Sequence, residues 1–391
     1  MYYSKGIVTR QAHVNIPAGT VEEEYAREGF FGRTSHLYRD QPPVGWIDIE
    51  GDLKPEAFRT SDLPGVSNDD YLNARVPFLT NADATLAMAI LSKPMPYYYR
   101  NADCDEILFV HRGTGEIETD FGPLNYEKGD YLVIPRGTVY RLSPETETAL
   151  LVIESVSQVR LPDKGVLGQH ALFDPGVINT PSPAPRNMGE EGRWQLKIKR
   201  LGKITTVTYP FNPINVVGWK GDLTVWQLNI RDIRPVLSEK YHLPPTAHCT
   251  FMMDEVVVCT FLPRPLETGD PGALRVPFYH NNIDYDEVLF YHEGNFFSRE
   301  GIEHGMITFH PQGIHHGPQP AAVKAADSKT RTDEKAVMID TRHPLELTPE
   351  AKSIAWPNYW KSWMGKSRQQ QTEKEEKIIS NILLLLQTFD T

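Results

Sequence analysis

The sequence predicts an all-β protein that contains two copies of one small barrel. From residue 76 to about residue 159, short segments of β-branched or alternating apolar residues follow one another, separated by turn residues. None of that stretch has the periodicity of a long amphipathic helix. After a proline-rich connector, a second series of strand-like segments repeats features of the first. Closely spaced strands are typical of a sandwich or barrel, so we expect two jelly-roll barrels, each a double-stranded β-helix.

The expected organisation has five parts. They are an N-terminal arm (residues 1–75), a first barrel (76–173), a proline-rich linker (174–195), a second barrel (196–345) and a C-terminal extension (346–391). The arm is polar and rich in turn residues, so we expect short strands and loops that wrap a neighbouring element. The extension ends with charged residues followed by an apolar stripe, which predicts a short helical tail.

Composition and charge exclude several classes of partner. The 391 residues are 40% hydrophobic and carry a formal net charge of −11, which argues against nucleic acid or an anionic membrane as partner. The three cysteines are odd in number and lack CxxC spacing, which favours a reducing compartment without a disulfide framework. The sequence begins without an apolar signal core, and its longest aliphatic run is too short to cross a bilayer. We therefore expect a cytoplasmic protein.

The two halves repeat at fixed spacing. An E-x6-G pattern begins at Glu106 in the first half and at Glu287 in the second. A G-x5-P-x-G pattern begins at Gly129 and again at Gly305. Two such patterns are hard to obtain twice by chance, so they indicate a duplicated barrel.

The copies differ at the positions that could bind a metal. His280 and His316 of the second half align with Tyr99 and Tyr140 of the first, and only the glutamate is retained. Two imidazoles and one carboxylate, without a thiolate, favour Fe(II) or Mn(II) and leave coordination positions open. The sequence therefore predicts a metal site formed by His280, Glu287 and His316 in the second barrel only.

One neighbouring carboxylate leaves the register of this site open. Asp286 is a rival ligand at a shorter spacing from His280, although the repeated glutamate favours Glu287. If Glu287 points into the barrel, strand alternation predicts that Leu289 and Tyr291 also point inward and that His292 points outward.

Other candidate groups have simpler explanations. We expect His13 and His36 in the arm to be surface or packing residues, His304 to be solvated, and His315 to point away from the site and make a backbone hydrogen bond. His248 and Cys249 are adjacent in a strand-like segment, so they would face opposite sides and could not act as a nucleophile pair.

The repeated patterns resemble the two motifs of the cupin family, which makes the chain similar to a bicupin. The second half resembles, more specifically, the homogentisate 1,2-dioxygenase family, in the segments VPFYHNN, DEVLFYHEG and HPQGIHHGP. The likeness is good over residues 215–320 and looser over 70–365.

The resemblance implies a role for each candidate residue. It makes His280, Glu287 and His316 the ligands of Fe(II), and it makes His242 and His310 catalytic residues that contact the substrate phenol and oxygen. Where the family holds the substrate carboxylate with Tyr and Lys, this chain has Phe296 and Arg299, and Tyr291 could line the same pocket. Arginine could still bind a carboxylate, but the loss of the tyrosine hydroxyl leaves the substrate open.

The expected function is therefore extradiol-type ring cleavage that consumes O2 and a small aromatic acid. Homogentisate, in tyrosine or aromatic catabolism, is the first expected substrate, and maleylacetoacetate would be the product. Gentisate or another hydroquinone is the alternative, and a non-catalytic or isomerase-type metal-binding bicupin is a second. The family's habit also predicts a homo-oligomer.

Overall fold

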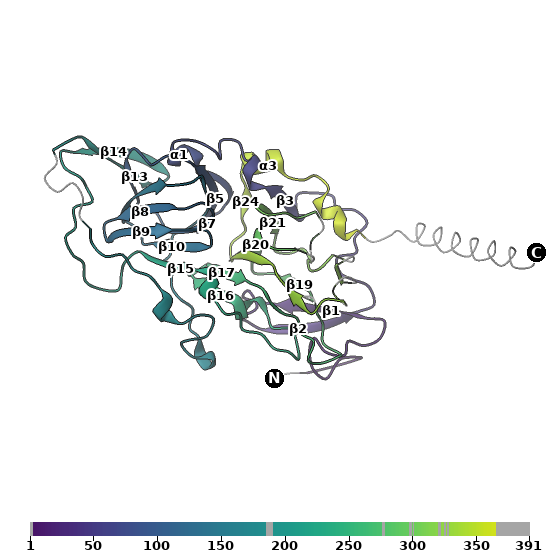
Figure 1. Cartoon of the computed structure of the whole chain (residues 1–391). Helices are drawn as coiled ribbons and strands as arrows, with labels where there is room; N and C mark the ends of the chain where they lie inside the picture. The colour runs from purple at the N-terminus through teal and green to yellow at the C-terminus, as the bar shows by residue number, and fades with distance from the viewer. Residues whose placement is uncertain are drawn as a thin grey trace, which may run out of the picture.

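The computed structural model describes residues 3–184, 191–275, 278–296, 299, 301–319, 322–323, 326 and 328–364. Within these residues the protein is dominated by β-strands, which form two barrels side by side (Figure 1). The predicted helical tail lies outside the described residues. None of the described helices is long and apolar enough to cross a membrane.

The first barrel is formed by two large sheets. The seven-stranded sheet has the order β15 (Trp226–Asn229), β10 (Asp130–Ile134), β7 (Asp105–Arg112), β12 (Thr148–Ser155), β5 (Ala84–Leu91), β4 (Val76–Thr80) and β24 (Glu346–Leu347). The six-stranded sheet has the order β14 (Lys203–Tyr209), β13 (Trp194–Arg200), β6 (Tyr98–Asn101), β11 (Val139–Pro144), β8 (Gly115–Thr119) and β9 (Gly122–Tyr126). Leu108 and Leu132 of the first sheet meet Ile117 and Leu142 of the second in the apolar interior of the barrel.

The second barrel carries the candidate site. Its six-stranded sheet has the order β16 (Cys249–Met252), β17 (Val256–Phe261), β23 (Lys335–Thr341), β20 (Asp286–Glu293), β21 (Met306–His310) and β3 (Glu56–Arg59). A three-stranded sheet of β19 (Tyr279–Asn282), β1 (Val21–Ala26) and β2 (Thr34–Arg39) belongs to the same barrel (Figure 1). A two-stranded sheet pairs β18 (Arg264–Pro265) with β22 (Arg331–Thr332).

The described helices are short. The α-helices are α1 (Tyr71–Ala74) and α3 (Pro349–Ile354), and the 3-10 helices are η1 (Thr60–Asp62), η2 (Gly165–Leu167), η3 (Pro175–Val177), η4 (Ile230–Asp232), η5 (Pro245–His248) and η6 (Tyr359–Trp363). The last of these, η6, packs against the candidate site.

Strand pairing crosses the boundaries that the sequence suggested. The sequence predicted that residues 196–345 form the second barrel. In the structure, β13, β14 and β15 instead pair within the sheets of the first barrel, and β13 begins at residue 194, inside the predicted linker. In return, β1, β2 and β3 of the expected arm pair with strands of the second barrel. Each barrel is therefore completed by chain from the other side of the proline-rich linker, because an unpaired sheet edge leaves backbone groups exposed.

The two barrels share the largest hydrophobic core. Strand alternation turns Ile107 and Phe109 of β7 away from their own barrel, toward Val288 and Phe290 of β20, and all four are fully buried. The rings of Phe109 and Phe290 lie 6.3 Å apart. The predicted outward orientation of His292 agrees with this packing, since β-strand side chains alternate between faces and His292 contacts His111 of the first barrel.

Repeated glycines give both barrels the same turn geometry. Gly113 and Gly294 each adopt a φ of 98°, and a Cβ on Gly294 would lie 2.2 Å from the carbonyl oxygen of Asp333. Gly137 and Gly313 likewise have φ values of 87° and 90°. The repeat is therefore conformational, because these backbone angles strongly favour glycine.

Candidate metal centre

The three predicted ligands meet inside the second barrel. His280 lies on β19, Glu287 on β20, and His316 follows the turn after β21. The Nε2 atoms of both histidines lie 3.6 Å from Oε2 of Glu287, and the imidazole centroids are 4.1 Å apart. A pair of backbone hydrogen bonds, 2.9 and 3.0 Å long, joins His280 to His316 and fixes this approach.

The histidine tautomers are set by backbone carbonyls. Nδ1 of His280 donates to the carbonyl oxygen of Phe278 at 3.1 Å, and Nδ1 of His316 donates to that of Ile314 at 3.3 Å. Both Nε2 atoms are buried, and neither has a hydrogen-bond partner among the described residues. A buried nitrogen without a partner is costly, so two unpaired Nε2 atoms beside a carboxylate form a group that could hold a metal ion.

The protonation states suit metal binding. Burial, together with the neighbouring His280, lowers the pKa of His316 to about 3. Burial alone would raise the pKa of Glu287, but the charge of His316, the nearby imidazole of His280 and the hydrogen bond with His310 hold it well below its ordinary value. His316 is therefore a neutral imidazole and Glu287 an ionised carboxylate, the forms that bind metal.

Asp286 has a different task from Glu287. Its Oδ1 accepts a hydrogen bond from the backbone N–H of Gln312 at 2.7 Å, and its Oδ2 accepts one from Leu345 at 2.6 Å. In the first barrel, Asp105 accepts from the backbone of Arg136 and Val159 in the same way. Asp286 therefore anchors loops outside the cluster, which leaves Glu287 as the carboxylate of the site.

His310 lies behind the glutamate. Its Nδ1 is 2.7 Å from Oε1 of Glu287, its Nε2 is 3.3 Å from the hydroxyl of Tyr359, and the residue is fully buried. Its ring stacks on His316 at 4.8 Å and lies edge-on to Trp363 at 5.8 Å. The family resemblance implied that His310 contacts the substrate, which stays a prediction; in the structure its polar contacts are with Glu287 and Tyr359.

A pocket opens beside the cluster and takes in several predicted residues. Fifteen residues line it: His242, Leu243, Pro245, His248, Phe261, Arg264, Phe278, His280, Glu287, Leu289, Tyr291, Arg299, Glu334, Ala336 and Met338. Nδ1 of His242 lies 3.0 Å from Oε1 of the buried Glu267, which orients the imidazole. Arg299 donates to the carbonyl oxygen of Gly317 at 3.0 Å, and its guanidinium carbon lies 5.8 Å from the Trp363 ring centroid.

Phe296 differs from its expected role in substrate binding. It is buried behind Tyr291, with ring centroids 4.8 Å apart, and it packs in a cluster with Met306 rather than lining the pocket. Tyr291 reaches the pocket and shares a 3.0 Å hydrogen bond with Thr308. A bulky apolar ring next to an inward-facing tyrosine fills space more readily than it binds a polar substrate.

The N-terminal arm supplies parts of the site that sequence patterns missed. The ring of Phe30 lies 5.3 Å from that of His280, and Glu23 is 2.8 Å from Nε2 of His315. His315 thus contacts a carboxylate of the arm, where a backbone partner was expected. Glu267 was also missed, because a single glutamate in a loop carries no periodic or spacing signal.

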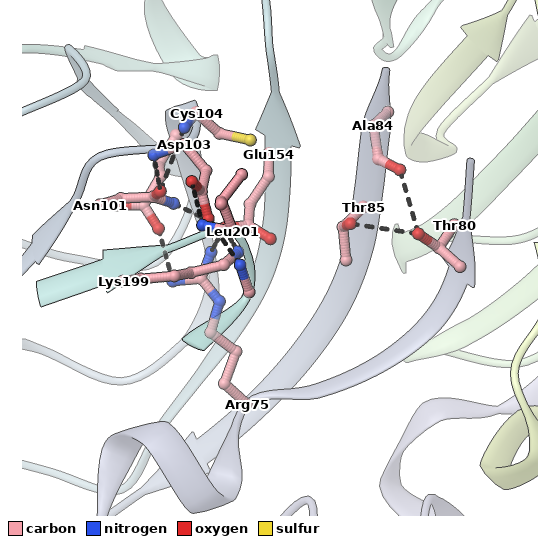
Figure 2. Close-up of polar contacts among 12 residues, drawn as sticks. Arg75, Thr80, Ala84, Thr85, Asn101, Asp103, Cys104, Glu154, Lys199 and Leu201 are labelled. Atoms are coloured by element: carbon pink, nitrogen blue, oxygen red, sulfur yellow. Dashed lines mark hydrogen bonds and ion pairs between the residues drawn. The ribbon is translucent and has the colours of Figure 1, made fainter. Parts of the chain in front are cut away.

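In the first barrel, an arginine side chain contacts the glutamate that corresponds to Glu287. Nη1 of Arg75 lies 2.5 Å from Oε1 of Glu106, the counterpart of Glu287, and Nη2 lies 2.9 Å from Glu154. Glu154 also accepts from Asn101 and Lys199, both at 2.5 Å (Figure 2). Side-chain cations therefore neutralise the carboxylates in the barrel that has lost both imidazoles.

The duplicated jelly-roll barrels and the two-histidine, one-carboxylate cluster define a double-barrel cupin with the kind of candidate metal site that oxygenases use. A sequence profile described as "Homogentisate 1,2-dioxygenase N-terminal" matches residues 51–230. The chain is also 36% identical over 384 residues to a "Putative dioxygenase" of Saccharolobus solfataricus, a match that covers 93% of this chain and 98% of that protein. The chain belongs to the homogentisate 1,2-dioxygenase family and is an oxygenase-type enzyme.

More distant relatives carry the family's full name. The homogentisate 1,2-dioxygenase of Dictyostelium discoideum is 29% identical to this chain over a match that covers 68% of it. That of Rhizobium leguminosarum bv. trifolii is 26% identical over a match that covers 69% of it. The matches span 65% and 63% of the length of those two proteins. Among solved structures, a cupin 2 conserved barrel domain protein from Leptotrichia buccalis covers 68% of this chain at 11% identity, with a TM-score of 0.32.

Proposed function

We propose that the protein is an Fe(II)-dependent dioxygenase that cleaves the ring of a hydroquinone-type aromatic acid, with homogentisate as first candidate. The observation that carries the proposal is the convergence of the two unpaired Nε2 atoms of His280 and His316 on Glu287, beside a pocket lined by aromatic and charged residues. Two histidines and one carboxylate suit non-haem Fe(II) and leave open positions for substrate and O2.

The side chains around the pocket suggest how substrate binds. Bound Fe(II) would supply electron donation to O2 and a Lewis-acid site for the substrate phenolate. His242, oriented by Glu267, would accept the phenolic proton as substrate enters. The Arg299 guanidinium would bind the substrate carboxylate, because its planar fork matches a carboxylate. The apolar wall formed by Phe278, Leu289 and Met338 would exclude water from the ring.

The overall reaction balances without another reductant. Homogentisate and O2 would give maleylacetoacetate, with both oxygen atoms kept in the product. The ring bond that breaks lies between a hydroxylated carbon and its substituted neighbour, and the two electron pairs come from the aromatic substrate. His310, hydrogen-bonded to Glu287, would keep the carboxylate oriented during this cycle.

A second candidate substrate follows from the pocket. Arg299, which stands where the family has a lysine, lines the pocket. Phe296, which stands where the family has a tyrosine, has no hydroxyl and packs behind Tyr291. Gentisate, whose carboxylate is attached directly to the ring, would place that group differently from homogentisate. The relation between Arg299 and the cluster therefore decides which acid is bound in a productive orientation.

Oxygen uptake after metal reconstitution tests the proposal. The full chain would be stripped of metal, loaded with Fe(II) under anaerobic conditions, and mixed with homogentisate, gentisate or hydroquinone in an oxygen electrode. We expect uptake with an acid substrate, and a fall to background in His280→Ala. His170→Ala, which removes an exposed imidazole, is the matched control and should retain activity. Absence of uptake from the loaded protein with all three compounds would contradict the proposal and favour an isomerase-type or non-catalytic cupin.

A further inference from the structure

We propose that His13, Glu24 and His36 form a second binding site, specific for a divalent transition-metal ion, one strand away from the first. One ligand atom from each of these residues lies within 4.8 Å of the others. The sequence had suggested surface or packing roles for both histidines. His13 is only 6% exposed, and it contacts two buried glutamates of β1, Glu22 and Glu24.

Sheet register explains why these residues meet. Glu24 on β1 is the register partner of His280 on β19 and of His36 on β2. Register partners on adjacent strands place their side chains on the same face of a sheet. The second cluster therefore lies on the same face as His280, and Glu24 stands between the two histidine groups.

The N-terminal arm places His13 beside Glu24 in an unusual backbone conformation. His13 has a φ of 66°, and its ring stacks on Phe278 at a centroid distance of 4.4 Å and an interplanar angle of 9°. A non-glycine residue in this left-handed region is uncommon and is often found at functional sites. The same Phe278 ring lies 5.8 Å from His280, so one aromatic side chain separates the two clusters.

Glu22 acts as an outer carboxylate for His13. It is 3% exposed, both of its oxygens accept from the backbone N–H of His13 at 3.1 Å, and Oε1 contacts Nδ1 of the ring. With Nδ1 facing Glu22, Nε2 lies on the other side of the ring, 3.5 Å from Oε2 of Glu24. A carboxylate behind an imidazole is the arrangement that orients metal-binding histidines.

The edge histidine provides an independent indication. Nδ1 of His36 is buried and has no hydrogen-bond partner among the described residues, and it lies 3.7 Å from Oε1 of Glu22. Two imidazoles and a carboxylate, with a second carboxylate nearby, are a ligand set for Zn(II) or Fe(II) rather than for Ca(II) or Mg(II). A metal held here would connect residue 13 to the β1–β2 hairpin and so fasten the arm across the mouth of the second barrel.

Metal stoichiometry separates this site from the first. The full chain, stripped with a chelator, would be equilibrated with Zn(II), desalted and analysed for zinc per chain. We expect two equivalents for the unmodified chain, one for His36→Ala, one for His280→Ala, and two for the control His170→Ala. Glu24→Gln, which retains the shape of the side chain, should bind the second zinc at least tenfold more weakly. Circular dichroism would verify that each variant is folded.

The outcomes are distinguishable from those of the oxygenase test. A single equivalent in the unmodified chain that His36→Ala leaves in place would overturn the second site and identify the cluster as an ion-pair network. Two equivalents retained by His36→Ala would also overturn it. A single equivalent that survives His280→Ala but is lost in His36→Ala would support the second site and count against the first.

Discussion

Arg75 and Glu106 form a buried ion pair in the first barrel at the position that matches the candidate metal ligand of the second. The two barrels thus neutralise equivalent glutamates differently, with a guanidinium in one and, we propose, a metal ion in the other. In β12, Glu154 is the register partner of Glu106, and in β23, Asp340 is the register partner of Glu287. Burial, followed by the charge of Glu287, raises the pKa of Asp340 well above its ordinary value, whereas Arg75 and Lys199 hold the pKa of Glu154 below its ordinary value against burial.

Arg75→Met should destabilise the protein strongly. Removing the guanidinium leaves two buried carboxylates without their main cation, which typically costs about 3–5 kcal/mol. Urea unfolding would measure the change in free energy of unfolding. Arg112→Met is the matched control, because its ion pair with Glu147 is exposed and should contribute less than about 1 kcal/mol. Equal effects of the two substitutions would contradict a special role for Arg75.

His310→Phe should weaken metal binding at the first site without removing a ligand. The substitution keeps an aromatic ring against His316 but deletes the hydrogen bond to Glu287. Loss of such an outer partner typically costs 10–100-fold in metal affinity or activity. Competition with a chelator would measure the dissociation constant. Tyr359→Phe removes only the 3.3 Å contact on the other side of His310 and should have a smaller effect; unchanged affinity in His310→Phe would count against the orienting role.

Arg299→Ala should impair acids selectively. If the guanidinium binds the substrate carboxylate, the variant should raise KM for homogentisate or gentisate by about tenfold or more, since hydrogen bonds to a charged group are worth roughly 1.5–3 kcal/mol. Hydroquinone lacks the carboxylate, so any turnover of that compound should change little. Arg299→Lys should restore only part of the loss, because lysine cannot bind bidentately. Equal losses on all three compounds would indicate a structural role instead.

Acidification should loosen the contact between the barrels. His111 and His292 meet there with their Nδ1 atoms 2.9 Å apart. Burial first, and then neighbouring positive charges, lower the pKa of His111 to about 4 and that of His292 to about 3. Unfolded histidine titrates near pH ~6.5, so below that pH the unfolded chain binds protons that the folded chain does not. The free energy of unfolding should therefore fall as the pH drops from about 7 to about 5, by roughly 2 kcal/mol per histidine.

A double substitution tests this assignment. His111→Leu/His292→Leu should lose less stability on acidification than the unmodified chain, measured by urea unfolding at both pH values. His170→Leu replaces an exposed histidine and should leave the pH dependence unchanged. An identical pH dependence in the double variant would mean that other groups are responsible.

Gly294→Ala should be costly for two reasons. The residue has a φ of 98°, and an added Cβ would meet the backbone of Asp333. Gly202→Ala has a similarly positive φ of 69° but open space around it, so it should cost only the conformational ~1–2 kcal/mol. Thermal unfolding would measure how much more Gly294→Ala destabilises the protein than Gly202→Ala does. Equal destabilisation would mean that the backbone angle alone is responsible.

Local sequence patterns predicted the parts of the fold that repeat. The E-x6-G and G-x5-P-x-G spacings predicted the duplicated barrel, and strand alternation predicted that Leu289 and Tyr291 face inward while His292 faces outward. The approach of His280, Glu287 and His316 was also expected from the repeat, because duplicated strands place equivalent residues at equivalent points. Their role as ligands stays a prediction.

Long-range contacts were not predictable in the same way. The sequences of β13 and β15 do not indicate which barrel these strands join. Which sheet edge a strand pairs with depends on the three-dimensional arrangement of the chain rather than on the periodicity of its residues. The cluster around His13 depends on a left-handed backbone residue, on the register of β1 with β2, and on the pairing of β1 with the distant strand β19. The displacement of Phe296 from the pocket was missed because the sequence does not reveal which of two adjacent aromatic rings fills the core.

The exchange of strands between the barrels has a consequence for biosynthesis. β3 is translated long before β21, its partner, and the two cannot pair until about 250 further residues have emerged. Such non-local pairing slows folding and leaves edges exposed in the meantime. Neither half is an autonomous unit, so a gene fragment that begins at residue 196 would yield a polypeptide lacking three of the strands that close its own barrel.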